Sequence, residues 1–213
     1  MKLSKFIDHT LLKPTATEAD IKKLCGEAEE NDFYAVCVNP VFVKLAKECL
    51  KGTNVKVACV IGFPLGANCT EVKKTEAEKA ILDGADELDM VMNQGLFKEG
   101  KFDEVVRDID AVCEGGVPVK VIVETSQLSN DEIVKVCELV NLSRAEFIKT
   151  STGFIGEGAR ESDVKLMKSL MKNGKKVKAS GGIRDQETFK KMLAAGADRI
   201  GTSGGVQLVK IVE

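Results

Sequence analysis

The chain alternates short apolar runs with longer segments in which apolar residues recur every three or four positions. Short apolar runs are typical of buried strands, and the longer period indicates helices with one apolar face. The runs predict eight strands, at residues 5–10, 33–38, 55–61, 87–92, 118–124, 146–150, 176–179 and 199–202. Helices are predicted between them, at about residues 18–28, 40–50, 70–82, 102–114, 130–141, 162–172 and 185–195, with a short helix after the last strand.

Polar residues mark the starts of several of these helices. Thr17 and Ser129 each precede a carboxylate by three residues, Asp20 and Glu132, which is the pattern of a capping box. Asn39-Pro40 predicts an N-cap followed by proline at the first helical position. These signals support the alternation of strand and helix.

One joint between helix and strand occurs twice. Gly84-Ala85-Asp86 and Gly196-Ala197-Asp198 each place a glycine at a helix end and Ala-Asp before a strand. Eight strands separated by helices imply parallel pairing, so we expect a single (β/α)8 TIM-barrel domain over residues 1–213. A barrel typically needs ~250 residues, so most loops must be short. The alternative is a doubly wound open sheet, although no G-x-G-x-x-G follows the first strand.

Composition excludes several classes of function. The formal net charge is −2 with interleaved signs, which argues against a nucleic-acid binder. No run approaches the ~20 apolar residues of a membrane span, and no secretory signal is visible, so we expect a cytoplasmic protein without membrane binding. The seven cysteines form no C-x-x-C pair, and Cys37 and Cys59 are expected as free thiols in the core. His9 is the single histidine, so a metal site built on two or three histidines is impossible. A carboxylate-only Mg²⁺ site remains open but has no motif in this sequence, and we expect no metal or cofactor.

Polar residues gather near the carboxyl ends of the predicted strands, where barrels carry their active sites. These residues are Asp8, Thr10, Asp89, Glu124, Lys149 and Lys178. Lys149 belongs to a strand expected to be covered on both faces, and a buried ammonium tends to lose its proton. The neutral amine is a nucleophile that can form a Schiff base. The alternative is a packed lysine whose charge reaches the strand end.

Two neighbours bear on Lys149. Lys178, one strand over, is a second cation that would lower the pKa of Lys149. Asp89 could hold a water, move a proton or form an ion pair with either lysine. Lys120 is the chief rival nucleophile, but it lies four residues before the end of its strand. We therefore interpret Lys120 as a deeper structural partner of a carboxylate.

Two glycine-rich segments follow the last two strands. Gly181-Gly182-Ile183-Arg184 and Gly201-Thr202-Ser203-Gly204-Gly205 come where barrels often bind phosphate. Glycines let backbone N–H groups approach an anion closely. Each segment alone could be a tight turn, and Arg184 could be either a charge partner or a solvated helix residue. The two together predict a phosphate site.

Six segments resemble the 2-deoxyribose-5-phosphate aldolase family, in the family's order and nearly end to end. They are Asp8 to Pro14, Ala35 to Pro40, Gly62 to Gly66, Glu87 to Val91, Phe147 to Gly153, and Lys178 to Arg184. Lys-Thr-Ser-Thr-Gly followed later by Lys-x-x-Gly-Gly is specific to the family. The resemblance implies a barrel and a metal-free class I aldolase. Its reaction reversibly cleaves 2-deoxy-D-ribose 5-phosphate to acetaldehyde and D-glyceraldehyde 3-phosphate, in deoxyribose catabolism.

The resemblance also assigns roles to residues of this chain. It implies that Lys149 forms the Schiff base, Lys178 lowers its pKa, and Asp89 is the acid/base residue working through water. Asp8 would hydrogen-bond near Lys178. The remaining substrate-binding positions are Thr10, Thr152, Gly153, Gly181, Gly182, Gly201 and Ser203. Some members carry a phosphate-holding lysine at the position of Phe154, relatives are often homodimers, and Gly204-Gly205 stands where some relatives have serine.

Two other functions remain open at this point. A phosphate-binding isomerase or epimerase could use Asp89 or Glu124 as a base without covalent chemistry. A non-catalytic sugar-phosphate sensor on the same barrel is the third possibility. The presence of Asp89, Lys149 and Lys178 together argues against the sensor.

Overall fold

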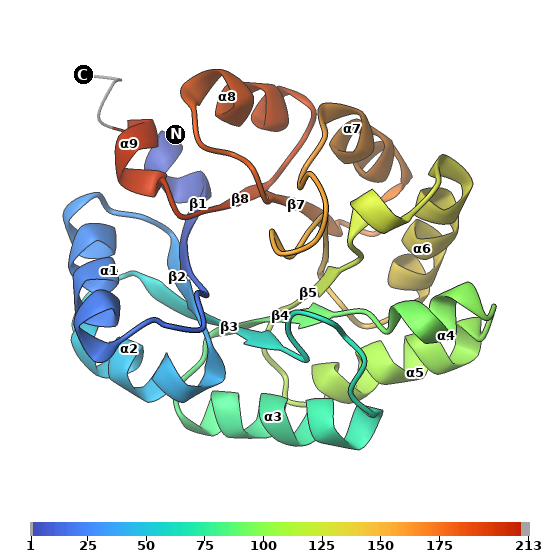
Figure 1. The fold of residues 1–213 in the computed structure, drawn as a ribbon, viewed down its shortest axis with the longest axis horizontal. Coiled ribbons are helices and arrows are strands. Elements are labelled where there is room, and N and C mark those ends of the chain that lie inside the picture. The colour runs from blue at the N-terminus through green and yellow to red at the C-terminus, as the bar shows by residue number, and fades with distance from the viewer. Residues whose placement is uncertain (1, 210–213) are drawn as a thin grey trace.

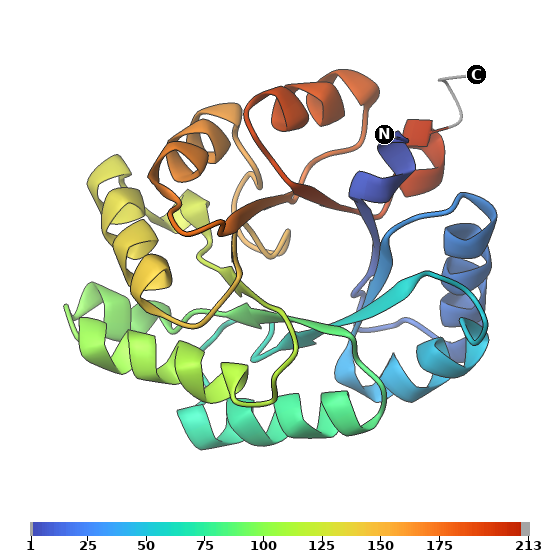
Figure 2. The ribbon, with the colours of Figure 1, turned by 180° about the vertical axis from the view of Figure 1, so that it is seen from behind.

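The computed structural model describes residues 2–209, which form a closed barrel of eight parallel strands in chain order. The strand nearest the N-terminus pairs with the last one and closes the barrel, which excludes the open-sheet alternative. Helices surround the barrel on its outside (Figure 1), and the same ring is seen from behind in Figure 2. The predicted (β/α)8 fold is confirmed.

The strands are β1 (Ile7–Leu11), β2 (Ala35–Val38), β3 (Lys56–Ile61), β4 (Glu87–Val91), β5 (Val119–Ile122), β6 (Phe147–Lys149), β7 (Lys176–Ser180) and β8 (Arg199–Thr202). The α-helices are α1 (Glu18–Glu30), α2 (Val43–Cys49), α3 (Thr70–Leu82), α4 (Gln94–Lys98), α5 (Phe102–Cys113), α6 (Asn130–Leu142), α7 (Glu161–Leu170), α8 (Gln186–Ala194) and α9 (Gly205–Val209). Short 3-10 turns are η1 (Leu3–Phe6), η2 (Pro40–Phe42) and η3 (Thr125–Gln127).

The main core lies between the outer faces of the strands and the inner faces of the helices. Alternate strand residues such as Val36, Val57, Leu88 and Ile148 are fully buried in it. A second, small apolar cluster fills the barrel interior beside β1 to β3; it consists of Leu12, Cys37, Ala58 and Val60. The interior beside β4 to β8 is charged instead, together with Asp8 of β1, and this difference places the candidate site.

The repeated joint has the same structural role in both copies. Asp86, before β4, accepts a hydrogen bond from the backbone N–H of Val57 on β3 at 2.9 Å. Asp198, before β8, accepts one from Val177 on β7 at 2.8 Å. Each aspartate also forms an ion pair with a lysine of a nearby helix, Lys47 or Lys168. The joint therefore ties the start of one strand to its neighbour.

Helix starts agree with the sequence at two capping boxes and differ at one site. Thr17 and Ser129 form both bonds of a capping box, as predicted. Asn39 does not cap a helix with its side chain, because its amide donates to the carbonyl of Leu12 at 3.3 Å. Residues 40–42 form a 3-10 turn, so α2 begins at Val43 rather than at Pro40.

Strand ends differ from the prediction by one or two residues at several places, for example at β2, which begins at Ala35 rather than at residue 33. The first strand begins at Ile7, because residues 3–6 form η1, which lies beside α9 (Figures 1 and 2). β5 ends at Ile122, and Glu124 has a left-handed backbone with φ 52°. The segment after β4, expected to be a loop, contains α4, whose start is capped by Asn93 accepting from the N–H of Leu96 at 3.1 Å.

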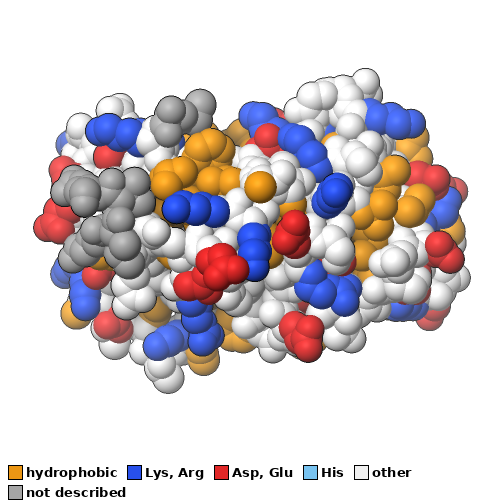
Figure 3. Space-filling model, turned by 90° about the horizontal axis from the view of Figure 1, so that it is seen from above, with side chains coloured by type: hydrophobic (Ala, Val, Ile, Leu, Met, Phe, Trp, Pro, Cys, Tyr) orange, Lys and Arg blue, Asp and Glu red, His pale blue; other side chains and the backbone are white. Residues whose placement is uncertain are grey.

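The outer surface carries both signs of charge. On the face seen in Figure 3, acidic and basic side chains are interspersed among apolar and neutral ones. Within residues 2–209, none of the helices has the length and apolar character needed to cross a bilayer.

Candidate active site

Seven charged side chains meet inside the barrel, four basic and three acidic. They are Lys120, Lys149, Lys178 and Arg199, with Asp8, Glu87 and Asp89. All seven are buried. Strand register explains the meeting, because Asp89 lies opposite Lys120, and Lys178 lies opposite both Lys149 and Arg199. Residues in register on neighbouring parallel strands point to the same side of the sheet.

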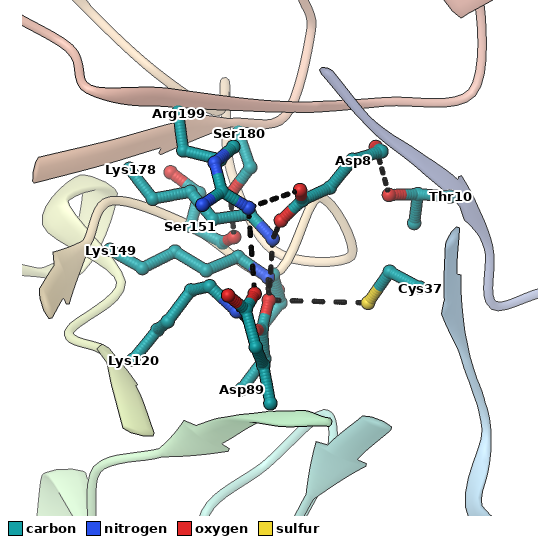
Figure 4. A network of polar contacts seen from close by, with 12 residues as sticks. Asp8, Thr10, Cys37, Asp89, Lys120, Lys149, Ser151, Lys178, Ser180 and Arg199 are labelled. Atoms are coloured by element: carbon teal, nitrogen blue, oxygen red, sulfur yellow. Dashed lines mark hydrogen bonds and ion pairs between the residues drawn. The ribbon is translucent and has the colours of Figure 1, made fainter. Parts of the chain in front are cut away.

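Asp89 is the centre of this network. Its Oδ2 accepts hydrogen bonds from Nζ of Lys149 at 2.7 Å and from Nζ of Lys178 at 2.8 Å. Its Oδ1 accepts from Nζ of Lys120 at 2.8 Å. Figure 4 shows the three lysine side chains converging on this one carboxylate. The Cys37 thiol is also near, with Sγ 3.9 Å from Oδ2, but it belongs to the apolar cluster, as predicted.

The other two carboxylates fix the remaining cations. Asp8 pairs with Lys178 and, at 2.8 Å, with Nη1 of Arg199. Glu87 pairs with Lys120 at 2.6 Å and with Arg199 at 3.4 Å. Lys120, Lys178 and Arg199 therefore each contact two carboxylates. Sequence reasoning missed Glu87 and Arg199, although a charged residue at the start of a buried strand was a signal that it needs a partner.

Lys149 differs from the other three basic residues, because its ammonium contacts a single carboxylate. The network contains one more basic group than acidic groups. Buried charges are costly unless they are paired, so loss of one proton would balance the network at three against three. Lys149 has fewer carboxylate partners than the other basic residues of the network, so we expect its amine to be the neutral one.

Shifts in pKa agree with this expectation. Burial lowers the pKa of Lys149 from its ordinary value, Asp89 opposes that shift, and Lys178 adds to it. Burial alone would also lower the pKa of Lys178, but Asp8 and Asp89 raise it above its ordinary value. Burial likewise opposes the charge of Lys120, and Asp89 and Glu87 raise its pKa. The network thus separates one lysine with a lowered pKa from two with raised values.

The carboxylates shift in the opposite direction. Burial would raise the pKa of Asp89, but Lys120, Lys149 and Lys178 outweigh it and hold that pKa well below 3.8. Burial likewise opposes ionisation of Asp8, and Lys178 and Arg199 lower its pKa to about 2. Both carboxylates are therefore anions at neutral pH, and each is already bonded to basic side chains.

Lys178→Met tests the electrostatic effect of Lys178 on Lys149. Loss of this cation is expected to raise the pKa of Lys149, because a repulsive charge disappears and Asp89 is shared with one fewer lysine. At pH 7 reductive methylation of Lys149 should slow by about tenfold for each unit of pKa. The measurement is the rate of Lys149 modification against pH by mass spectrometry. Lys178→Arg is the control, and an unchanged profile in Lys178→Met would contradict the effect.

A pocket of about 190 Å³ opens above the network at the carboxyl ends of the strands. Of the seven network residues, Lys149 alone lines it. The remaining wall comes mainly from the loops after β1, β6, β7 and β8. The segment after β6 curls across the barrel opening in Figure 1. Lys149 is therefore the buried basic group that a ligand in this pocket would reach.

Glycines allow two of these loops to touch. Gly158 and Gly181 have φ 84° and 86°, and a Cβ on Gly158 would lie 2.5 Å from the carbonyl carbon of Gly181. Gly201 serves another purpose, since a Cβ there would lie 3.0 Å from Cβ of Ser180 and 3.1 Å from Cε of Lys178, so a larger residue would crowd both side chains. The loops after β6 and β7 therefore pack backbone against backbone, and β8 leaves room for the Lys178 side chain.

Glu124 shapes the loop after β6. Its Oε2 accepts from the backbone N–H of Thr152 at 3.1 Å and from the Thr152 hydroxyl at 2.5 Å. The Thr152 hydroxyl in turn accepts from the N–H of Phe154 at 3.1 Å. Glu124 thus holds one wall of the pocket but does not line it. The sequence placed Glu124 near the site, but it predicted neither this contact nor the left-handed backbone of Glu124.

The structure brings most of the predicted site residues together. Those that line the pocket are Thr10, Lys149, Thr152, Gly153, Gly181, Gly182, Gly201 and Ser203. Asp8, Asp89 and Lys178 lie beneath it, in the network, so Asp8 is placed to hold Lys178 rather than to line the pocket. Lys120 is confirmed as the partner of two carboxylates. Within residues 2–209, no cluster of three or more histidine, cysteine or carboxylate side chains is arranged to hold a metal ion.

Comparison with known proteins finds close relatives. The model of the DeoC/LacD family of aldolases matches residues 3–212. A deoxyribose-phosphate aldolase of Thermococcus gammatolerans is 56% identical, over 99% of this chain and 96% of the relative. Deoxyribose-phosphate aldolase 1 of Staphylococcus aureus is 53% identical, over 100% of this chain and 98% of the relative. The structure of a tetrameric deoxyribose phosphate aldolase from Aeropyrum pernix superposes with a TM-score of 0.90 at 36% identity, covering 98% of this chain and 89% of that one.

Proposed function

This chain belongs to the DeoC/LacD family of aldolases, and on that premise we propose that it reversibly cleaves 2-deoxy-D-ribose 5-phosphate through a Schiff base on Lys149. The products would be acetaldehyde and D-glyceraldehyde 3-phosphate, as expected for deoxyribose catabolism. The observation that carries the proposal is the position of Lys149. It is the network lysine with a lowered pKa, and it is also the network residue that lines the pocket.

The chemistry begins with attack of the neutral Lys149 amine on the C1 aldehyde of the open-chain sugar. The carbinolamine loses water and becomes a protonated imine, which withdraws electrons from C2. Removal of the proton from the C3 hydroxyl breaks the C2–C3 bond and releases glyceraldehyde 3-phosphate. The electron pair of that bond remains as an enamine. Protonation at C2 and hydrolysis of the imine release acetaldehyde and restore the amine.

Residues of the charged network assist the steps of this reaction in which a charge forms or a proton moves. The charge of Lys178 lowers the pKa of Lys149 and so favours the neutral amine, which is the nucleophilic form. Asp89, with Oδ2 at 2.7 Å from the reacting nitrogen, stabilises the positive charge of the imine. Because its pKa is so low, Asp89 is better suited to orient a water that carries protons than to hold a proton itself.

The same pKa disfavours the simple acid/base alternatives. A carboxylate that accepts hydrogen bonds from three lysines, two of them with raised pKa values, is a weak base, and Asp89 does not line the pocket. Glu124 is held by Thr152 and does not line it either. An isomerase or epimerase using either carboxylate therefore has little structural support.

The decisive experiment traps the imine. The protein is incubated with acetaldehyde and sodium borohydride, which reduces the imine to a stable secondary amine. Intact-mass spectrometry should show the gain of one ethyl group, and peptide mapping should place it on Lys149. A protein that gains no group behaves as an acid/base enzyme or a sensor, and a group on Lys120 or Lys178 would refute the assignment of the nucleophile.

We expect a homodimer, and the tetrameric relative from Aeropyrum pernix supports an oligomeric state. Light scattering during size-exclusion chromatography measures the mass in solution. A monomer at micromolar concentration would contradict this expectation without affecting the chemistry.

A further inference from the structure

The pocket is basic at its rim as well as at its depth. Lys149 lies at the depth and is 3% exposed, whereas Lys13 and Arg184 are exposed residues of the loops after β1 and β7. Among the described residues that line the pocket, none is acidic. A rim with two cations and no carboxylate favours an anionic group on the ligand.

The loop after β8 lies between these two cations. In the closed barrel, β8 has β7 on one side and β1 on the other. Gly201 and Ser203 therefore offer their backbone and hydroxyl at a position flanked by Arg184 on one side and Lys13 on the other. A phosphate seated on the β8 loop would meet a basic side chain from each neighbouring loop.

Lys13 has a fixed backbone and an unengaged side chain. The carbonyl of Leu12 accepts from Asn39 at 3.3 Å, and the carbonyl of Lys13 accepts from the N–H of Ala16 at 3.1 Å. Within residues 2–209, neither Lys13 nor Arg184 forms an ion pair. Asp20 is the carboxylate influenced by Lys13, but its Oδ2 is already bonded to Thr17. The Lys13 ammonium is therefore available to a ligand.

The loop after β6 supplies no cation to this rim. Phe154 occupies its place in the lining, half exposed, and packs edge-on against Phe63 with ring centroids 5.1 Å apart. An aromatic ring cannot pair with a phosphate. The positive charge at the rim must come from the loops on the other side of the pocket.

We propose that Lys13 binds the phosphate of the substrate and sets the preference for phosphorylated over unphosphorylated sugars. The inference rests on the proposed aldolase function and deepens it. Lys13 and Arg184 approach the dianion from two sides, while the glycines of the β7 and β8 loops contact it through backbone N–H groups. Lys13 does not touch the carbon atoms that react, so its effect falls on binding.

The test compares cleavage of 2-deoxyribose 5-phosphate with cleavage of 2-deoxyribose. In Lys13→Met, kcat/KM for the phosphorylated sugar should fall by about tenfold or more, mainly through KM, because a charge-assisted contact is lost. Cleavage of the unphosphorylated sugar should be unchanged, and inorganic phosphate should inhibit more weakly. Lys13→Arg should keep the preference. Lys51→Met, which removes an exposed lysine between α2 and β3 at the opposite end of the barrel, is the matched control.

The outcomes separate this inference from the proposed function. An unchanged ratio of the two kcat/KM values in Lys13→Met would overturn the role of Lys13, as would an equal loss with both sugars. A wild-type protein that cleaves neither sugar and forms no borohydride adduct would instead overturn the aldolase proposal on which the inference rests.

Discussion

Replacing Lys149 by leucine is expected to abolish cleavage of 2-deoxyribose 5-phosphate while leaving the barrel folded. Removal of a catalytic nucleophile lowers kcat by about 10⁴-fold or more when no other group can replace it. Lys120 and Lys178 are poor substitutes, because each is bound by two carboxylates and neither lines the pocket. The measurement is the rate of aldehyde release by the purified variant.

We expect the fold to persist because removal of Lys149 leaves every carboxylate of the network paired with at least one other basic side chain. Without it, three basic and three acidic side chains remain. Leucine is apolar and smaller than lysine, so it fits a buried site without introducing an unpaired charge. We expect the free energy of unfolding to change by less than about 2 kcal/mol, as measured by urea denaturation.

Lys120→Leu is the matched control, since it makes the same change in the same network. It leaves Glu87 and Asp89 with one fewer cation each, so it should cost about 3–5 kcal/mol of stability. At temperatures where it remains folded, it should still form the borohydride adduct on Lys149. Near-normal turnover in Lys149→Leu would refute the Schiff base, and a severe loss of stability would refute its neutral state.

The fold was predictable because its signals are local. The alternation of apolar runs with helical periodicity, and the Gly-Ala-Asp pattern before β4 and β8, are both visible in residues adjacent in the chain. Lys149 of β6 and Lys178 of β7 were predictable as neighbours for the same reason. Two consecutive strands of a parallel barrel usually lie side by side, so Lys149 and Lys178 were expected to meet.

The rest of the network depends on closure of the barrel. Asp8 and Arg199 are 191 residues apart and meet only because β8 pairs with β1. Glu87 meets Arg199 across the barrel interior, which no local pattern encodes. Asn39 is a smaller example of a local pattern that fails because of a tertiary contact. Its sequence pattern predicts a helix cap, but its side chain donates to the carbonyl of Leu12 instead.

Asp89→Asn is expected to lower the free energy of unfolding by about 3–5 kcal/mol at pH 7, because it removes the anion that pairs with the buried ammonium groups of Lys120 and Lys178 and also bonds to Lys149. Asparagine has nearly the shape of aspartate, so the change tests charge rather than packing. Its amide could face the lysines with an oxygen, but without the negative charge that offsets their burial. Urea denaturation of both proteins measures the difference.

The contribution of Asp89 to the free energy of unfolding depends on pH. The pKa of Asp89 is held far below 3.8 in the folded chain, whereas the unfolded chain has the ordinary value. Its contribution to stability is therefore complete above the unfolded value and is lost as the pH falls below about 3.8 toward the native pKa. The difference between wild type and Asp89→Asn should be largest near neutrality and should narrow in acid.

Asp20→Asn serves as the comparison for Asp89→Asn, since Asp20 also has a lowered pKa, owing to its hydrogen bonds from Thr17. Asp20 is exposed, so water replaces much of what the carboxylate provides, and its substitution should have a far smaller effect on stability. If Asp89→Asn unfolds at the same urea concentration as wild type at pH 7, the three lysines cannot all depend on Asp89. In that case the ammonium groups of Lys120 and Lys178 would be held by Glu87 and Asp8 alone, and Asp89 would be free to act in proton transfer.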